Sequence, residues 1–181
     1  MERLMIFIDA EYVIQKIKDF GDSRTHIRLK DIQWNNLIQW IINKRKLIRC
    51  YYYSAQLSEQ ENPKTYQEQK EYLKELKIKI PYFEVKLGRL VYINNIWIQK
   101  GLDIKIALDM FSKAVTNQYD VAALVSGDSD FVEVIYEIKE RYGKCVELYT
   151  FDYAIHDSLK LCADKHIVIN DQIAKLHRFW Y

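Results

Sequence analysis

The chain has 181 residues, of which 49% are hydrophobic and 14% aromatic, and 27 basic against 25 acidic residues give a formal net charge of +2. This composition excludes a disordered chain and predicts one domain, residues 1–181, with a substantial core. No apolar run approaches the roughly 18 residues of a membrane-spanning helix. Three isolated cysteines without CxxC spacing predict buried thiols and no zinc site. We therefore expect a cytoplasmic protein without membrane contact.

The first half of the chain alternates strand and helix patterns. Leu4–Ile8 is a short, continuous apolar run, which is typical of a strand buried on both faces of a parallel sheet. Leu29–Lys44 has apolar residues at helical spacing, and Leu47–Tyr53 is a second strand of the buried kind. Ser58–Lys77 is strongly polar with Pro63 within it, which predicts a loop leading into an exposed helix.

The second half begins with a segment that departs from this alternation. Tyr82–Gln99 is rich in β-formers, with a Leu87-Gly88 breaker and an Asn-Asn pair, which predicts a strand followed by a β-hairpin arm. Beyond it the chain alternates again, so the whole pattern predicts an α/β fold: a three-layer αβα sandwich around a mostly parallel, doubly wound sheet. The later elements are helix Leu102–Val115, strand Val121–Val125, helix Phe131–Tyr142 and strand Cys145–Tyr149.

Three acidic clusters stand at or beside the ends of these elements. Asp9 and Glu11 follow the first strand, Asp103 opens a helix, and Asp128 and Asp130 lie in a Ser-Gly-Asp-Ser-Asp-Phe loop after a buried strand. Ligands of open α/β sheets bind beyond the carboxyl ends of the strands, where strand order reverses. Carboxylates that converge there repel one another unless a cation lies between them. The clusters therefore predict a site for a hard divalent cation such as Mg²⁺.

Each cluster also has an ordinary structural interpretation. An Asp that ends a strand is commonly a turn residue, an acid in a first helical turn complements the helix dipole, and Ser129 or Asp130 can cap the next helix. It is the combination of three clusters that favours a metal site. Asp109 lies six residues beyond Asp103 and points to another side of the helix, so it ranks with Glu11 as a second-tier ligand.

Three segments resemble motifs of the NYN domain, the LabA-like branch of the PIN-like nuclease superfamily: Ile6–Asp9, Lys100–Asp109 and Leu124–Phe131. The resemblance covers most of the chain, including Tyr82–Arg89 and Leu159–Asp164. It implies a PIN-like fold and a ribonuclease that uses Mg²⁺ or Mn²⁺, with an endonuclease favoured. By position, the residues that match the family's acidic site are Asp9, Asp103, Asp128 and Asp130, with Asp109 as a further frequent acid.

One position departs from that family. Its first motif usually continues Asp-Gly-x-Asn, whereas this chain has Asp9-Ala10-Glu11-Tyr12. Tyr12 in place of Asn makes a catalytically weak or inactive nucleic-acid-binding module the main alternative. A haloacid dehalogenase-like phosphatase is a second alternative, because it also places acids two residues apart after its first strand; that alternative gives Asp103 no role.

Substrate binding by such a nuclease needs positive charge and surfaces for base stacking. The implied partner is single-stranded RNA. The aromatic C-terminal residues 179–181 either pack back on the sheet, which we favour, or contact a second copy of the chain in a homodimer. For the basic groups and aromatic residues, solvation and packing are the favoured explanation, and for Lys100 they explain the residue equally well. The candidates for substrate contacts are Ser126, Ser129, Lys100, Arg89 and Trp97.

Overall fold

The computed structural model describes residues 1–20, 29–93, 96–151 and 155–180, and side chains are described for these except at positions 20, 29 and 89–100. Among these residues the strands are β1 (Arg3–Asp9), β2 (Lys46–Ala55), β3 (Phe83–Ile93), β4 (Ile96–Lys100), β5 (Val121–Val125), β6 (Cys145–Thr150) and β7 (Lys165–Val168). The α-helices are α1 (Ala10–Phe20), α2 (Trp34–Ile42), α3 (Pro63–Lys79), α4 (Leu102–Val115), α5 (Val132–Tyr142), α6 (Asp157–Cys162) and α7 (Asp171–Leu176). Short 3₁₀ turns are η1 (Leu29–Asp31) and η2 (Ser129–Phe131).

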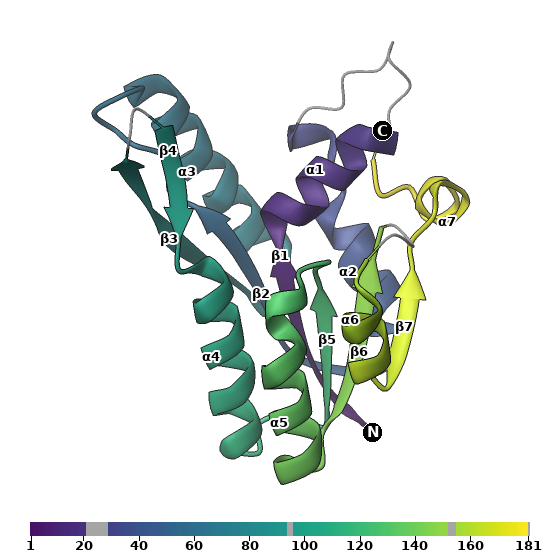
Figure 1. Ribbon diagram of the computed structural model, residues 1–181. Coiled ribbons are helices and arrows are strands. Elements are labelled where there is room, and N and C mark those ends of the chain that lie inside the picture. Colours follow the sequence, from purple (N-terminus) through teal and green to yellow (C-terminus); the bar gives the residue numbers. More distant parts are fainter. Residues whose placement is uncertain (21–28, 94–95, 152–154, 181) are drawn as a thin grey trace.

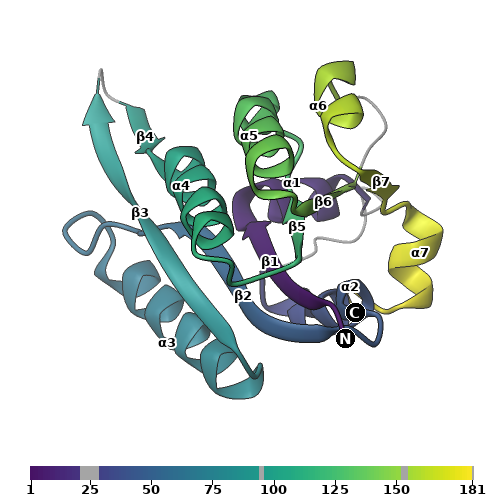
Figure 2. The ribbon, with the colours of Figure 1, turned by 90° about the horizontal axis from the view of Figure 1, so that it is seen from below.

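The described residues form a seven-stranded sheet in the order β4-β3-β2-β1-β5-β6-β7. Every neighbouring pair is parallel except β3 and β4, which form an antiparallel hairpin at one edge. Figure 2 shows α2 and α3 on one side of the sheet and α4 and α5 on the other. The three-layer α/β fold predicted from the sequence is therefore confirmed.

The central strands are apolar throughout because helices cover both of their faces. Successive side chains of a strand point to opposite faces, so Ile6 and Tyr52 pack on the side of α1 and α2, whereas Phe7 and Tyr51 pack on the side of α4 and α5. Both faces of the sheet are thus covered by helices, and the side chains of each strand pack alternately against one layer and the other. This burial leaves the ends of the strands as the places where polar groups can meet.

Strand order reverses at β1. β2 and β3 extend the sheet on one side of β1, and β5, β6 and β7 extend it on the other (Figure 1). The parallel register pairs Leu4 with Val121 and Ile8 with Val125, so Asp9 and the connection after β5 emerge at the same edge. β1 and β5 are therefore neighbours, and the first and third acidic clusters follow them at one edge of the sheet.

The predicted helix Leu29–Lys44 is shorter than its apolar spacing indicates. Its first residues form the turn η1, and α2 begins only at Trp34. The cause is the C-terminal segment: the Gln33 N–H donates to the Phe179 carbonyl at 2.7 Å, and Ile32 forms a bridge with Trp180. Phe179 is fully buried. The interpretation that this tail packs back on the sheet is therefore confirmed for 179–180, and Tyr181 lies outside the described residues.

The predicted breaker at Leu87-Gly88 does not interrupt its strand, since β3 runs through it to Ile93. A Cβ atom at Gly88 would lie 2.9 Å from Cδ1 of Leu102, so the glycine makes room for the start of α4 and breaks nothing. The hairpin arm is confirmed as β3 and β4, while the predicted Asn94-Asn95 turn lies outside the described residues. Four further elements, α1, α6, β7 and α7, form where the sequence pattern indicates none.

The described cysteines are free, with Cys50 and Cys162 buried and Cys145 half-buried. None of the helices in the described part of the chain is long and apolar enough to cross a membrane.

Candidate metal centre

Asp9 stands at the junction of β1 and α1. It is the last residue of β1 and α1 starts at Ala10, so its carboxylate is placed by both elements. Oδ1 accepts the N–H of Tyr12 at 3.2 Å, as a residue that caps a helix N-terminus does. Oδ2 accepts the hydroxyl of Ser126 at 3.2 Å. These two bonds fix the carboxylate at the carboxyl edge of the sheet.

The connection between β5 and α5 is tied to Asp9 through the buried Ser126. While the Ser126 hydroxyl donates to Asp9, its oxygen accepts the N–H of Asp128 at 3.3 Å. Asp128 in turn caps η2, because its Oδ1 accepts the N–H of Asp130 at 2.9 Å. One hydroxyl therefore holds the third acidic cluster beside the first.

Asp103 lies at the start of α4, the helix that follows the β3–β4 hairpin. It is the second residue of α4 and follows Gly101, whose φ of +76° allows the chain to turn from β4 into the helix. Burial raises the pKa of Asp103, and the charges of Asp128 and Asp130 raise it further. The carboxylates of the second and third clusters thus act on each other electrostatically.

The pKa of Asp9 is also raised, mainly because the side chain is buried. Burial raises the pKa of Asp9 to about 6, the hydrogen bonds from Tyr12 and Ser126 oppose that rise, and the charges of Asp103 and Glu11 add to it. A group of hard oxygen donors that repel one another is what a divalent cation binds and relieves. The residues present therefore fit such a cation. Within the described residues, however, no three Asp, Glu, His or Cys side chains already lie close enough together to hold one.

A cleft of about 630 Å³ opens beside Asp9. Its acidic lining comes from the first and third clusters, while Asp103 and Asp130 lie outside the lining. Asp130 contacts Asp128 through its backbone N–H, and the charges of Asp128 and Asp130 act on Asp103. Glu11 is held at the cleft by the Ser54 hydroxyl, which donates to its Oε1 at 2.9 Å. The lining residues are Asp9, Glu11, Tyr12, Gln15, Lys16, Ser126, Gly127, Asp128, Ser129, Ile155 and His156.

Asp109 belongs to a different cluster on the same helix. Its Oδ2 accepts the hydroxyl of Tyr53 at 2.8 Å, its Oδ1 pairs with Lys113 at 2.8 Å, and Lys86 lies 3.9 Å away. Burial favours its neutral form, but these partners outweigh burial and lower the pKa of Asp109. This carboxylate already has cationic partners, whereas Asp9 and Asp103 have none among the side chains that the structure describes.

Residues 3–170 match the family model of the NYN domain. The chain belongs to the NYN domain family. Domains of this family are generally nucleases of the PIN-like superfamily and usually use a divalent metal. The resemblance stated from the acidic motifs is thereby confirmed at the level of the family.

The fold of this NYN domain is also seen in a crystal structure. A Vibrio parahaemolyticus protein of unknown function superposes with a TM-score of 0.70 at 23% sequence identity, and the alignment covers 94% of each chain. At this identity the likeness concerns the fold alone. Among curated proteins none matches the chain.

Tyr12, which stands where NYN domains usually have Asn, packs against the acidic loop. A Cβ atom at Gly127 would lie 2.8 Å from Cε2 of the Tyr12 ring. The Tyr12 hydroxyl accepts the N–H of Phe151 at 3.0 Å, and the two rings meet edge to face at 6.2 Å. Tyr12 therefore links α1 to the ends of β5 and β6, and the absence of a side chain at Gly127 makes the contact fit.

The cleft of the NYN domain includes two cationic or titratable residues that the sequence patterns did not single out. Lys16 lies one turn beyond Tyr12 on α1, and His156 precedes α6. The helical spacing of Tyr12 and Lys16 could have indicated Lys16 had α1 been predicted. Of the other candidates for substrate contacts, Ser126 and Ser129 line the cleft. The side chains of Arg89, Trp97 and Lys100 lie outside the described ones.

Proposed function

We propose that this NYN domain is a metal-dependent nuclease, of the LabA-like branch, that cleaves single-stranded RNA internally. Mg²⁺ or Mn²⁺ would be held by Asp9, Asp103, Asp128 and Asp130, with Glu11 nearby. The observation that carries the proposal is the meeting of the acidic clusters at one sheet edge, where the Ser126 hydroxyl joins Asp9 to Asp128. The raised pKa of Asp9, caused mainly by burial and in part by the charges of Asp103 and Glu11, supports it. A buried carboxylate that lacks a cationic partner among the described residues is what a catalytic cation would neutralise.

The residues of the chain have distinct parts in this proposal. Asp9 is the fixed ligand, because both of its oxygens are already oriented by donors. Asp128 and Asp103 have to move toward it when a cation binds, since the acids do not yet form a closed ligand group. When bound, the cation would supply charge neutralisation at the phosphate and activation of the attacking water. Lys16 is positioned to contact a phosphate from the wall of the cleft.

A second candidate is a nucleic-acid-binding module without turnover. Two observations favour it: Tyr12 occupies the space beside Gly127, and the acids that the structure describes lie too far apart to hold a metal as they stand. In that case the fold would bind RNA and the acidic centre would be vestigial. The two candidates differ in one result: a nuclease cleaves RNA when a metal is added, whereas a binding module leaves it intact.

The test uses a labelled single-stranded RNA, a single-stranded DNA and p-nitrophenyl phosphate, each with Mg²⁺, Mn²⁺ or EDTA. We expect internal cleavage of the RNA with either metal and none in EDTA. Asp128→Asn should lower the rate roughly 100-fold or more, because a metal supplies several kcal/mol and each tenfold is about 1.4 kcal/mol. The amide oxygen of Asn can still cap η2, so the fold is kept.

The matched control lies on α4. Asp103→Asn should abolish cleavage and weaken Mn²⁺ binding measured by calorimetry, whereas Asp109→Asn, six residues further along, should leave both largely intact. RNA binding without cleavage under every metal, with affinity unchanged in Asp128→Asn, would establish the binding module instead. Turnover of p-nitrophenyl phosphate without RNA cleavage would establish the phosphatase.

A further inference from the structure

Helix α3 carries opposite charges on its two flanks. Lys70, Lys74 and Lys77 lie at spacings of four and three residues, so they form one row along the helix. A groove of about 420 Å³ runs beside this row, between α3 and β3. On the other flank a second hollow is lined by acids that include Glu68, Glu71 and Glu75. The groove is lined by Gln56, Tyr66, Gln69, Lys70, Leu73, Lys74, Lys77, Val85 and Leu87.

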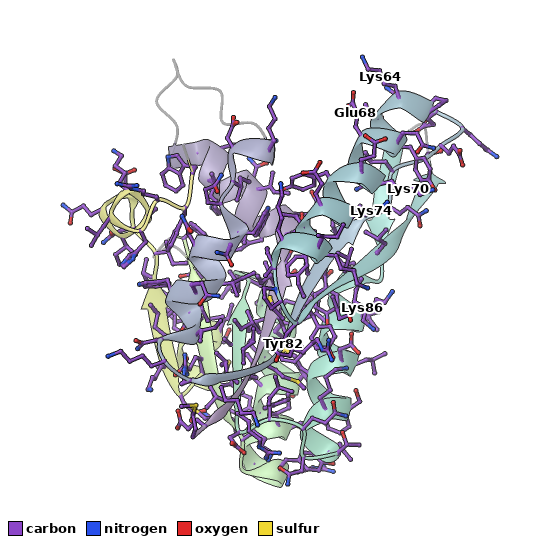
Figure 3. All side chains as sticks on the ribbon, turned by 180° about the vertical axis from the view of Figure 1, so that it is seen from behind. Lys64, Glu68, Lys70, Lys74, Tyr82 and Lys86 are labelled. Carbon is purple, nitrogen blue, oxygen red and sulfur yellow. The ribbon has the colours of Figure 1, made fainter. Side chains whose placement is uncertain are left out.

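Two lysines of this row are available to bind an anionic ligand. Lys77 pairs with Glu84 at 3.1 Å, whereas within the described residues Lys70 and Lys74 form no ion pair. The described residues that line the groove include no Asp or Glu. Figure 3 shows Lys70 and Lys74 following one another along α3. Unpaired ammonium groups above an apolar floor suit a polyanion that also carries flat, apolar groups.

The groove opens at the same edge of the sheet as the acidic centre. Asp9 pairs with Tyr53 in β2, and Tyr53 pairs with Lys86 in β3, so Leu87 is about one residue past the level of Asp9. Adjacent strands lie about 4.8 Å apart, and the two spacings from β1 through β2 to β3 separate the sites along the sheet by roughly 10 Å. Gln69 holds the N-terminal half of α3 at this edge. Its side-chain amide donates to the Ala55 carbonyl at 2.8 Å and accepts the Leu57 N–H at 3.0 Å.

We propose that the groove between α3 and β3 binds a single nucleic-acid strand that continues from the acidic centre, with Lys70 and Lys74 on its phosphates. The proposal rests on the proposed function, which supplies the strand. Tyr66 lines the groove near the carboxyl edge and gives an aromatic side chain on which a base can stack. A strand that spans both sites contacts more phosphates than one confined to the centre. Binding therefore grows with length beyond what the acidic centre alone can hold.

The experiment measures binding without cleavage. Fluorescence anisotropy in EDTA, in an Asp128→Asn background, compares labelled RNA and DNA strands of about 4 and about 12 nucleotides, within the span of known single-strand sites. Lys70→Gln/Lys74→Gln should weaken binding of the longer strands about tenfold at low salt. It should also reduce the slope of log affinity against log salt by about 1.4, because each phosphate that a lysine no longer neutralises lowers that slope by about 0.7. The short strands should be affected less than twofold, because they fit at the acidic centre alone.

The matched control is Lys64→Gln/Lys79→Gln, which removes the same charge from the same helix outside the groove, and it should change neither quantity. Equal effects of the two double variants would mean that only net charge matters and would overturn the groove. So would an unchanged salt slope in Lys70→Gln/Lys74→Gln, or binding of phosphatidylserine vesicles in place of oligonucleotides. If the wild type cleaves RNA but the salt slope of Lys70→Gln/Lys74→Gln is unchanged, the groove proposal is wrong and the nuclease proposal stands. If the wild type binds strands through these lysines but does not cleave RNA, the nuclease proposal is wrong and the groove proposal stands.

Discussion

At the scale of single residues, Asp9 combines a position that suits a ligand with a cost to the fold. Burial is the main reason why its pKa is raised to about 6 from an ordinary value of 3.8. A carboxyl whose pKa is higher in the folded chain stabilises the fold when protonated, and this stability is lost as pH rises from about 4 through 6. At neutral pH the ionised Asp9 therefore destabilises the metal-free protein, by about 3 kcal/mol at most.

The expected result follows directly. Asp9→Asn should raise the free energy of unfolding in EDTA at pH 7.5 by up to about 3 kcal/mol, and by roughly half as much at pH 5. Urea denaturation at the two pH values measures this difference. Asp109→Asn should do the opposite, because the pKa of Asp109 is lowered by its lysine and tyrosine partners and its charge stabilises the fold above its unfolded pKa. A loss of stability in Asp9→Asn at pH 7.5 would show that the ionised Asp9 carboxylate does not destabilise the fold.

At the scale of elements, the packing of α1 on the acidic loop depends on one ring and one glycine. Gly127→Ala would push its new methyl group against the Tyr12 ring, which is held by Phe151. We expect a loss of about 1–3 kcal/mol, as overpacking usually costs. In a Tyr12→Asn background the same change should cost at least about 1 kcal/mol less, because the ring is gone. Costs that add within about 0.5 kcal/mol would rule out this contact.

The elements differ in how far their sequences predict them. Val121–Val125 and Leu102–Val115 form as predicted, because continuous apolar runs and helical spacing are local signals of burial. α2 starts late because Phe179, far along the chain, accepts the hydrogen bond of Gln33. No local pattern contains that contact.

The same distinction holds for the candidate site. Asp9, Asp128 and Asp103 are visible as acids beside element ends, and the structure brings them within electrostatic range of one another. Lys16 and His156 enter the cleft only because α1 and the residues before α6 meet across the sheet edge. Whether these residues bind a metal or substrate stays a prediction.

At the scale of the whole molecule, one ion-pair network joins the two halves of the sheet. Arg45, in the turn before β2, pairs with the buried Glu147 of β6 at 2.9 Å, and Lys165 of β7 lies 3.2 Å from the same carboxylate. The Arg45 side chain also donates to the Ile41 carbonyl at 2.7 Å. Burial opposes ionisation of Glu147, but these partners outweigh it and lower its pKa. The network thus spans the point where strand order reverses.

Arg45→Met should lower the free energy of unfolding by about 3 kcal/mol, because among the described residues it leaves the buried carboxylate of Glu147 with the exposed Lys165 as its one cation. Lys79→Met breaks an exposed pair with Glu75 and should cost no more than about 1 kcal/mol. Thermal and urea unfolding measure both. Adding Glu147→Gln to Arg45→Met should recover part of the loss. Equal costs for Arg45→Met and Lys79→Met would mean that the network does not stabilise the fold.

The prediction that residues 1–181 are one domain stays a prediction.

The passage of β1 into α1 without a connecting residue has a consequence for how such a site changes in evolution or in the laboratory. Asp9 cannot be shifted without displacing a central strand or a helix, so its position is inherited with the fold. Asp128 and Asp130 lie in the short connection after β5, and Asp103 follows the Gly101 turn at the start of α4. We therefore expect that the metal preference and affinity of the proposed centre can be tuned by substitutions in those few residues while the scaffold stays unchanged.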